Sequence, residues 1–359
     1  MAVYTSINDP SAHFQNMLYT GNGSSGLAIT NTGNANLQPD WLWIKQRANT
    51  GNNSNGLWDS TRGASSRLLG DTTGAAESQT NVASFNSDGF TVNTGNIVNA
   101  NTGTYVAWQW KANGGTTSSN SSGSITSSVQ ANSTAGFSIV TYAGTGSNAT
   151  VGHGLGTAPQ TVLIKKYGTG GSNRAWIMYM EILGNTKALF LNDSDPEYTL
   201  TDAFNSTSPT STTFSIGTNG RCNDSGEGYV AYCFAAKQGF SHFGSYTGNN
   251  NSDGPFVYTG FKPAWVMTKR TDSSGNWYIY DTERNGASGP NTNQAHKILY
   301  SNDSSGEVVN TDRGIDMIAH GFKIRNTLGN TNADGGTYIY WAFATHPFVS
   351  SAGVPATAR

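Results

Sequence analysis

The sequence has few charged residues, few cysteines and no long apolar run. Charged residues make up 12% of the 359 positions, and the formal net charge is −2. Lysine and arginine are thinly scattered, so the chain lacks the cationic cluster with which proteins bind nucleic acid phosphates. Apolar runs such as 41–44 and 161–164 are far shorter than the roughly 18 residues that cross a bilayer. The sequence therefore predicts neither nucleic acid binding nor membrane insertion.

The N-terminal segment MAVYTSINDPSAHF has neither the basic start nor the apolar stretch of a secretory signal peptide. We therefore expect synthesis in a cytoplasm without a signal peptide, where disulfides are disfavoured. The two cysteines, Cys222 and Cys233, are too few to bind zinc without further ligands. Both are expected to be small, partly buried thiols.

Amphipathic helices are also missing from the pattern. Leu, Glu, Lys, Arg and Ala never gather in a run of 3.6-residue period, whereas the chain has 44 glycines and is rich in Asn, Ser and Thr. This composition is typical of short strands joined by turns. The expected fold class is all-β.

What the sequence does contain is one unit written three times. Each copy opens with an alternating strand that ends in a Gly/Asn turn, at 14–23, 137–146 and 240–250. Repeats of this kind indicate homologous domains, and missing them would misassign the whole fold.

Each copy continues with a proline and an apolar strand that ends in a basic pair, at 38–47, 158–166 and 262–270. Proline is tolerated at the start of a strand, where its missing N–H does not disturb the hydrogen-bond ladder. The same element therefore occurs at the same place in all three copies.

The closing strand of each copy is strongly aromatic: GTYVAWQW (103–110), GYVAYCFA (228–235) and GTYIYWAFA (336–344). Alternate side chains of a strand share a face. The bulky face is expected to be the core of a sandwich, and it carries Val106, Trp108, Trp110, Val230, Tyr232, Phe234, Ile339, Trp341 and Phe343. The opposite face is smaller and is expected to be partly covered, and it carries Tyr105, Ala107, Gln109, Tyr229, Ala231, Cys233, Tyr338, Tyr340 and Ala342.

These repeats predict three tandem β-sandwich domains of lectin-like or jelly-roll-like type, at 1–112, 136–238 and 239–348. The Ser/Gly/Asn-rich segment 113–135 is expected to be a linker, although its SITSSVQ stretch could add one strand. The tail 349–359 is too polar to fold alone.

Two other arrangements are weighed against the sandwich. A small closed barrel is the alternative for each copy, and a three-bladed ring is disfavoured because the segment 113–135 breaks the regular spacing. Copies two and three are joined by only AKQG (236–239), so we expect them to pack as a rigid pair and the first copy to be freer.

Motifs for nucleotide binding and nucleophilic catalysis are weak or missing. The segment 21–26 matches GxGxxG, but LAITN follows it in place of a helix, so a turn is expected. A GxSxG nucleophile motif does not occur. The six histidines lie at unlike positions of the repeats, and we expect them to be dispersed surface or turn residues: His13, His153, His242, His296, His320 and His346.

Carboxylate pairs and calcium loops are also considered. Asp59 and Asp281 end an aromatic strand at one repeat position, where the second copy has Glu181 or nothing. A capping or turn role is favoured for them over the acid/base pair of a glycosidase. The loops 223–228 and 332–336 resemble calcium ligand sets in composition only, and their spacing fits no EF-hand. No catalytic residue, metal ligand or cofactor is therefore assigned.

Some aromatic residues fall outside the core phase of the closing strand. Tyr278, Tyr280 and Trp58 are candidates for a sugar-stacking platform, since aromatic rings offer an apolar face beside a polar edge. Burial in the core is the favoured alternative for each of them.

The assembled motifs resemble a known family. The segments DPSAHFQ, LQPDWLWIKQR, SFNSDGFTV, YVAWQWKANGGTTSSN, GFSHFGSYTGN and GTYIYWAFA, spread over 9–348, are similar to a repeated domain of virion proteins from marine bacteriophages, especially those of cyanobacteria. This resemblance implies a non-enzymatic structural protein on the particle exterior, either a tail fibre or a capsid decoration.

The resemblance also sets the expected partners. These are other virion proteins, with a homotrimer as the expected assembly, and the location is the virion surface, reached from the host cytoplasm. Host attachment or particle stabilisation is the expected role. The alternatives are a glycan-binding receptor module and, less favoured, a glycan-degrading enzyme.

Overall fold

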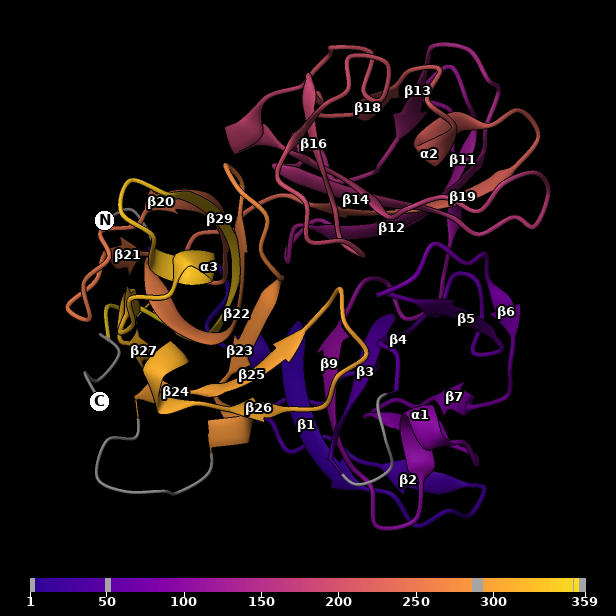
Figure 1. The fold of residues 1–359 in the computed structure, drawn as a ribbon. Coiled ribbons are helices and arrows are strands. Elements are labelled where there is room, and N and C mark those ends of the chain that lie inside the picture. The colour runs from indigo at the N-terminus through magenta and orange to yellow at the C-terminus, as the bar shows by residue number, and fades with distance from the viewer. Residues whose placement is uncertain (1–3, 49–52, 286–292, 351, 355–359) are drawn as a thin grey trace.

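The structure is a computed structural model, and it describes residues 4–48, 53–285, 293–350 and 352–354. Its strands form three groups, called here unit 1, unit 2 and unit 3 in chain order. Each unit has a large inner sheet and a smaller outer sheet, and every pairing between named strands is antiparallel. The expected all-β sandwich fold is thereby confirmed. In Figure 1 the three units appear as three lobes arranged around a common centre.

Unit 1 contains the strands of residues 14–110. Its inner sheet, in spatial order, is β1 (Phe14–Thr20), β9 (Thr104–Trp110), β3 (Trp41–Ala48), β4 (Gly56–Asp59), β5 (Ser66–Leu69) and β6 (Glu77–Ser78). Its outer sheet is β2 (Leu27–Ile29), β8 (Phe90–Val92) and β7 (Val82–Phe85), and its helical turns are η1 (Pro10–Ala12) and α1 (Asn96–Asn99).

Unit 2 contains the strands of residues 118–234. Its inner sheet is β10 (Ser118–Asn120), β11 (Ser127–Asn132), β12 (Phe137–Ala143), β19 (Gly228–Phe234), β14 (Thr161–Lys166), β15 (Ile177–Met180), β16 (Lys187–Phe190) and β17 (Tyr198–Thr199). Its outer sheet is β13 (Ala149–Gly152) and β18 (Thr213–Ile216), with η2 (Glu181–Leu183) and α2 (Gly220–Asn223) as helical turns.

Unit 3 contains the strands of residues 241–347. Its inner sheet is β20 (Ser241–Thr247), β29 (Thr337–Pro347), β22 (Phe261–Arg270), β23 (Tyr278–Asp281), β25 (Lys297–Tyr300) and β26 (Val308–Val309). Its outer sheet is β21 (Phe256–Tyr258), β28 (Gly321–Ile324), β27 (Ile315–Ile318) and β24 (Gln294–Ala295), and its helical turns are η3 (Glu283–Asn285), η4 (Thr311–Arg313) and α3 (Gly329–Asn332).

The three inner sheets share one order of strands, from the opening strand through the closing and proline strands to the aromatic strand. A buried asparagine at the end of each short helix, Asn99, Asn223 or Asn332, bonds to the backbone of the opening turn in every unit. These hydrogen bonds fix the turn and also satisfy the buried amide groups of the three side chains.

The segment 113–135 was expected to be a linker, but it contains β10 and β11. Both strands extend the inner sheet of unit 2 beyond β12. The polar composition of this segment did not predict buried strands. Ser127 is buried and its hydroxyl donates to Gly152 O. Gln130 is also buried, and its side-chain amide donates to the hydroxyl groups of Ser60 and Thr61. A polar strand can thus be buried when its side chains are paired.

The two faces of the closing strands have roles other than those expected. The mixed face, with Tyr105 and Ala107 in unit 1, lies in the core between the inner and outer sheets. The bulky face points the other way, into one apolar core that the three units share. There Trp41 stacks on Tyr232 of unit 2, with ring centroids 4.5 Å apart, and Trp110 lies edge-on to Trp265 of unit 3 at 5.7 Å. All nine tryptophans of the chain are fully buried.

The units are joined in a closed ring by one repeated contact. Lys45 of unit 1 donates to Ser304 O of unit 3, at 2.7 Å. The lysines at the same register position, Lys165 and Lys269, donate to Thr73 O of unit 1 and to Ser194 O of unit 2, at 2.9 and 3.1 Å. Each unit thus contacts the one before it, and unit 1 contacts unit 3, which is the closed form of a head-to-tail interface.

A second contact follows the same ring. Trp176 Nε1 donates to Leu69 O at 2.8 Å, and Trp277 Nε1 donates to Phe190 O at 3.0 Å. Asn55, at the equivalent position of unit 1, donates to Tyr300 O at 3.1 Å. The ring disfavoured from the sequence therefore exists, and unit 1 is held by the same contacts as the other two. The length of segment 113–135 does not exclude a ring of three units, because its residues form β10 and β11 of the inner sheet of unit 2.

Candidate functional site

The carboxylates considered for a glycosidase lie in the interfaces between units. Asp59 accepts from Arg62 Nε at 2.6 Å and from Tyr232 OH of unit 2 at 2.7 Å. The carboxylates of Asp59 and Asp281 are both fully buried. A carboxylate paired inside a packed core is closed to substrate. The expected turn role is confirmed, because Asp59 and Asp281 each accept from the backbone N–H three residues on, Arg62 N at 2.8 Å and Arg284 N at 2.9 Å. The structure adds an interface role to it.

The equivalent ion pair in unit 3, Asp281 with Arg284, has the same kind of contacts. Asp281 accepts from Arg284 Nε at 2.5 Å and from Trp108 Nε1 of unit 1 at 3.0 Å. In unit 2 the same register position is Met180 and not Glu181. The aromatic residue that would meet it, Trp341, has a buried Nε1 without a hydrogen-bond partner. At this position two interfaces thus contain an ion pair, and the interface of units 2 and 3 has the apolar side chain of Met180.

The aromatic residues proposed for a sugar platform are core residues. Trp58 and Tyr280 are fully buried and Tyr278 is 1% exposed. Their favoured alternative, burial, is what the structure shows. In the described residues the exposed aromatic side chains are instead Phe256 and Tyr258 of β21.

The remaining motifs are structural. The GxGxxG segment 21–26 forms a turn between β1 and β2, as expected. Cys222 and Cys233 are free and fully buried, which confirms them as thiols. Of the histidines, His153 departs from the surface expectation: it is buried, accepts from Leu155 N and bonds to Thr210 O. Buried polar rings are tolerated when both nitrogens have partners.

An open depression of about 460 Å³ lies on unit 2 where β10, β11 and β12 lie side by side. Ser119, Ser128 and Thr141 are direct cross-strand neighbours and form a row of hydroxyl groups along it. The remaining lining residues are Thr126, Ser127, Tyr142, Ala143, Tyr167, Gly226 and Gly228. Hydroxyl groups both donate and accept hydrogen bonds, so this surface suits a neutral ligand rich in hydroxyl groups.

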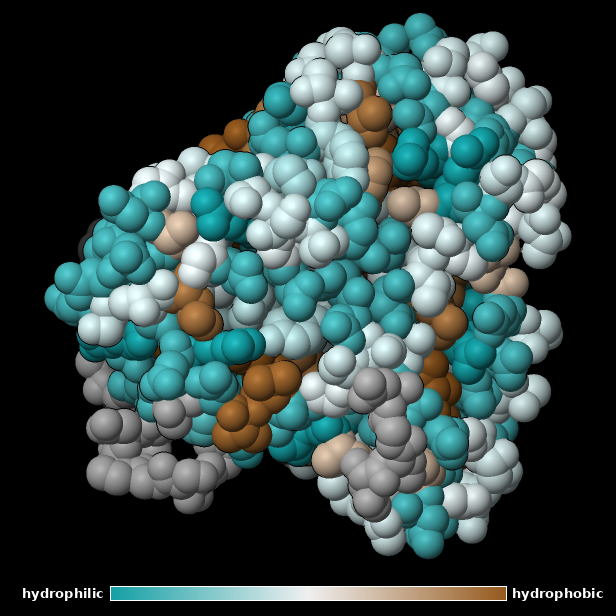
Figure 2. Space-filling model, in the orientation of Figure 1, coloured by the Kyte–Doolittle hydropathy of each residue, from teal (hydrophilic) through white to brown (hydrophobic). Residues whose placement is uncertain are grey.

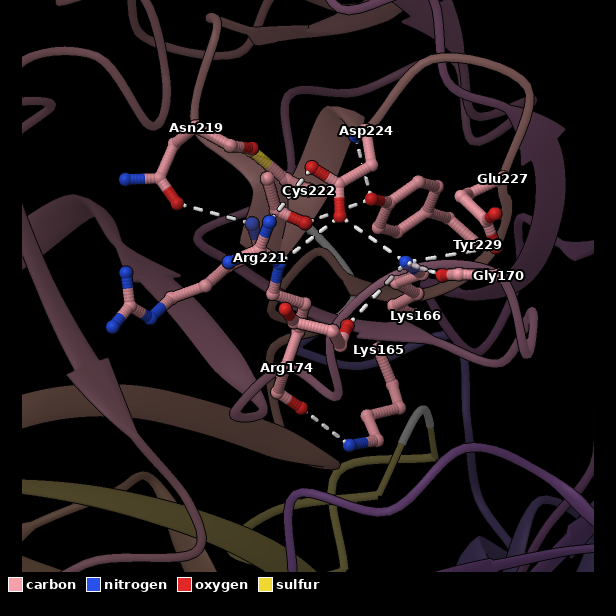
Figure 3. Close-up of polar contacts among 12 residues, drawn as sticks. Lys165, Lys166, Gly170, Arg174, Asn219, Arg221, Cys222, Asp224, Glu227 and Tyr229 are labelled. Atoms are coloured by element: carbon pink, nitrogen blue, oxygen red, sulfur yellow. Dashed lines mark hydrogen bonds and ion pairs between the residues drawn. The ribbon is translucent and has the colours of Figure 1, made fainter.

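A charged network lies between the strand end of β14 and the loop after α2 (Figure 3). Its Lys166 and Glu227 are next in sequence to Tyr167, Gly226 and Gly228, which line the depression. Lys166, with a side chain that is 2% exposed, bonds to Asp224 Oδ2 at 3.1 Å and lies 3.6 Å from Glu227 Oε2. Arg174 binds both oxygens of Asp224, each at 3.0 Å. Burial would raise the pKa of Asp224, but the hydrogen bonds from Arg174 and Lys166 outweigh it and lower that pKa.

The glycine-rich loop 168–171 closes this network. The carbonyl of Gly170 accepts from Lys166 Nζ. A methyl group at Gly170 would lie 1.9 Å from Glu227 Oε1, and one at Gly168 would lie 2.4 Å from Glu227 Oε2. The missing side chains of these glycines leave room for the carboxylate of Glu227 against the loop backbone. The cations of the network are therefore occupied by protein acceptors.

Metal and membrane sites are considered for residues 4–48, 53–285, 293–350 and 352–354, the ranges that the structure describes. In those ranges, no group of three or more His, Cys, Asp and Glu side chains is placed to hold a metal ion. None of the helices found there is long and apolar enough to cross a membrane.

One sequence pattern indicates the ring contacts, although it was not used to predict them. Lys45, Lys165 and Lys269 recur at one place in otherwise apolar strands. A lysine that recurs inside a buried strand indicates a paired interior cation, because an unpaired one would be too costly to bury. The row of hydroxyl groups gave no such signal, since Ser and Thr are abundant throughout the chain.

These observations define an all-β protein in which three sandwich units close around one core and one unit adds an open, hydroxyl-lined depression. The chain belongs to the family described as a domain of unknown function, DUF7483, whose model matches residues 9–347. No curated protein and no solved structure matches the chain.

Proposed function

We propose that the chain is a non-enzymatic structural protein on the outside of a bacteriophage particle, either a tail fibre or a capsid-surface component. It is made in the host cytoplasm, assembles as a homotrimer with other virion proteins, and serves host attachment or particle stabilisation. The long motif resemblance over 9–348 gives the proposal its class of protein.

One structural observation supports this function best. The three units bury all nine tryptophans and close on each other through repeated contacts. A closed ring has to open several interfaces at once to unfold, which favours slow unfolding in a protein exposed to the environment. The outer surface also fits: in Figure 2 hydrophilic and neutral side chains dominate the visible face, with apolar side chains in small patches.

Immunogold electron microscopy tests the location. Antibodies raised against the purified chain are expected to label intact particles whose genome encodes it, at one defined part of the particle. Antibody depleted on the purified chain serves as the control. Label that stays with host debris and never with particles would contradict the proposal.

Glycan binding is a second candidate function, and the depression on unit 2 favours it. Sugars present hydroxyl groups that donate and accept, and Ser119, Ser128 and Thr141 offer matching groups in a row beside Tyr167. Pockets of this kind gain specificity from a few placed polar groups.

Filling the depression should abolish this binding. The variant Ser128→Trp places a large ring at the centre of the hydroxyl row, and we expect at least a tenfold loss of signal on a glycan array. Ser245→Trp is the matched control, because Ser245 in β20 occupies the register position of Thr141 in β12. Equal binding by wild type and Ser128→Trp, or no binding by wild type, would reject the depression as a glycan site.

A further inference from the structure

The outer sheet of unit 3 exposes two large aromatic rings. Phe256 is 43% exposed and Tyr258 is 55% exposed, while every tryptophan of the chain is buried. They stand at alternate positions of β21, with buried Val257 between them. Side chains two residues apart share one face of a strand, so both rings lie on the outward face of this edge strand.

The position opposite Tyr258 keeps this face open. Tyr258 pairs with Gly321 across the strands. A methyl group on Gly321 would lie 2.0 Å from Val257 O and 3.0 Å from the ring of Phe256. Since only glycine fits there, no cross-strand side chain covers the ring of Tyr258.

Three further aromatic side chains, His320, Phe348 and Tyr4, lie around the exposed rings. His320 lies 5.1 Å from Phe256, 6.2 Å from Tyr258 and 5.5 Å from Phe348, measured between ring centroids. Tyr4 donates to Gly260 O at 2.7 Å, and its hydroxyl lies 3.4 Å from that of Tyr258. Rings held by several neighbours lose little conformational entropy when a ligand stacks on them.

Charged groups at the edge of the rings are fixed in ion pairs. Lys323 lies directly opposite Phe256 and bonds to Asp253 at 2.8 Å. Arg325 bonds to the same carboxylate at 3.0 Å and also to Asp316. The rings are thus bordered by paired donors and acceptors, with the carboxylate of Asp253 open to solvent.

We infer that Phe256, Tyr258 and His320 form a carbohydrate-stacking platform, here called the β21 platform. The C–H face of a pyranose ring is apolar and stacks on an aromatic ring, while its hydroxyl groups need polar partners at the rim. Asp253, Lys323 and the two tyrosine hydroxyls provide them. The inference deepens the proposed attachment role and rests on it for its biological meaning.

A second copy of the chain is the competing occupant. A dimer interface normally has an apolar centre of several hundred Å² and few charges in its core. Here two rings stand next to Lys323, Arg325 and Asp253, so stable dimerisation would bury charged groups. The chemistry therefore favours a small, hydroxyl-rich ligand.

Saturation-transfer difference NMR on the whole chain tests the platform, with lactose, maltose, mannobiose and chitobiose as probes. We expect transfer to the ring C–H protons of at least one probe. Tyr258→Ala and Phe256→Ala should each weaken binding of that probe about tenfold. Tyr258→Phe should retain most of it, since the ring remains. Val309→Ala, an exposed apolar side chain on edge strand β26 of the same unit, is the matched control and should bind as wild type does.

Three outcomes would overturn the inference. One is no transfer to any of the four sugars. Another is binding that Tyr258→Ala leaves unchanged, since the sugar would then lie elsewhere. The third is a dimer in sedimentation equilibrium that Tyr258→Ala dissociates, without sugar binding, which would give this face to a second copy. Failure of the particle labelling would leave the NMR result intact, so the two proposals fail separately.

Discussion

Replacing Asp281 with methionine is expected to lower the free energy of unfolding by about 3–5 kcal/mol. Asp281 is the centre of a buried network that accepts from Trp108 of unit 1 and from Arg284, and Glu307 links Arg284 to Arg47. Removing the carboxylate leaves the buried guanidinium of Arg284 without its main partner. It also leaves Trp108 Nε1 without an acceptor, which adds a desolvation cost.

The chain supplies its own control for this prediction. Unit 2 has Met180 and Leu183 at the positions of Asp281 and Arg284. The double variant Asp281→Met/Arg284→Leu copies that apolar interface, and we expect it to be destabilised by only about 1–3 kcal/mol, chiefly through Trp108. Urea unfolding at constant m-value measures four proteins: the wild type, Asp281→Met, Arg284→Leu and the double variant. A double variant as unstable as the sum of its single variants would contradict the ion-pair explanation.

The repeats and the fold class could be predicted from the sequence because they depend on local pattern. Alternating side chains, turn glycines and the recurring proline strand give the strands and their order. Trp110 and Trp341 could likewise be assigned to a core from their alternation alone. These inferences need no knowledge of what each sheet packs against.

Which layer a face meets could not be predicted, because both faces of the closing strands are buried. Trp108 and Tyr105 are equally inaccessible, yet Trp108 faces the neighbouring units and Tyr105 faces the outer sheet. Alternation shows that two residues point to opposite sides and not which neighbour covers each side. The closed ring forms because the bulky faces pack on the neighbouring units, and alternation alone could not predict this.

The hydroxyl-lined depression on unit 2 was harder still to predict from the sequence, since it is formed by polar segments. Ser119 and Ser128 come from the stretch expected to be a linker, and Thr141 comes from a separate strand. Nothing in the spacing of these hydroxyl residues distinguishes them from the many other Ser and Thr residues. The exposed rings of Phe256 and Tyr258 were hidden for a similar reason, because strand aromatics are usually buried and only the three-dimensional edge leaves them open.

Stability should rise with pH between about 7 and 10, through the three lysines of the ring. Burial lowers the pKa of Lys165 to about 7 and those of Lys45 and Lys269 to about 8. In the unfolded chain each lysine stays protonated to about pH 10.4. Between these values the unfolded state binds more protons than the folded state, so the free energy of unfolding increases with pH. Each lysine contributes up to about 1.4 kcal/mol per pH unit, and together they amount to a rise on the order of 5 kcal/mol from pH 7 to 9.5.

Above pH 10 the sign reverses. Burial raises the pKa values of Tyr19, Tyr142 and Tyr246 well above the ordinary value, so the unfolded chain loses these protons first and stability falls. Urea unfolding at pH 6 to 11 should therefore show a maximum near pH 9–10. Lys165→Met should reduce the slope between pH 7 and 9.5 by about a third, whereas Lys187→Met, at a side chain one third exposed, should leave it unchanged. A flat profile over this range would mean that the three lysines remain charged in the folded ring, held by the carbonyl groups of the neighbouring units.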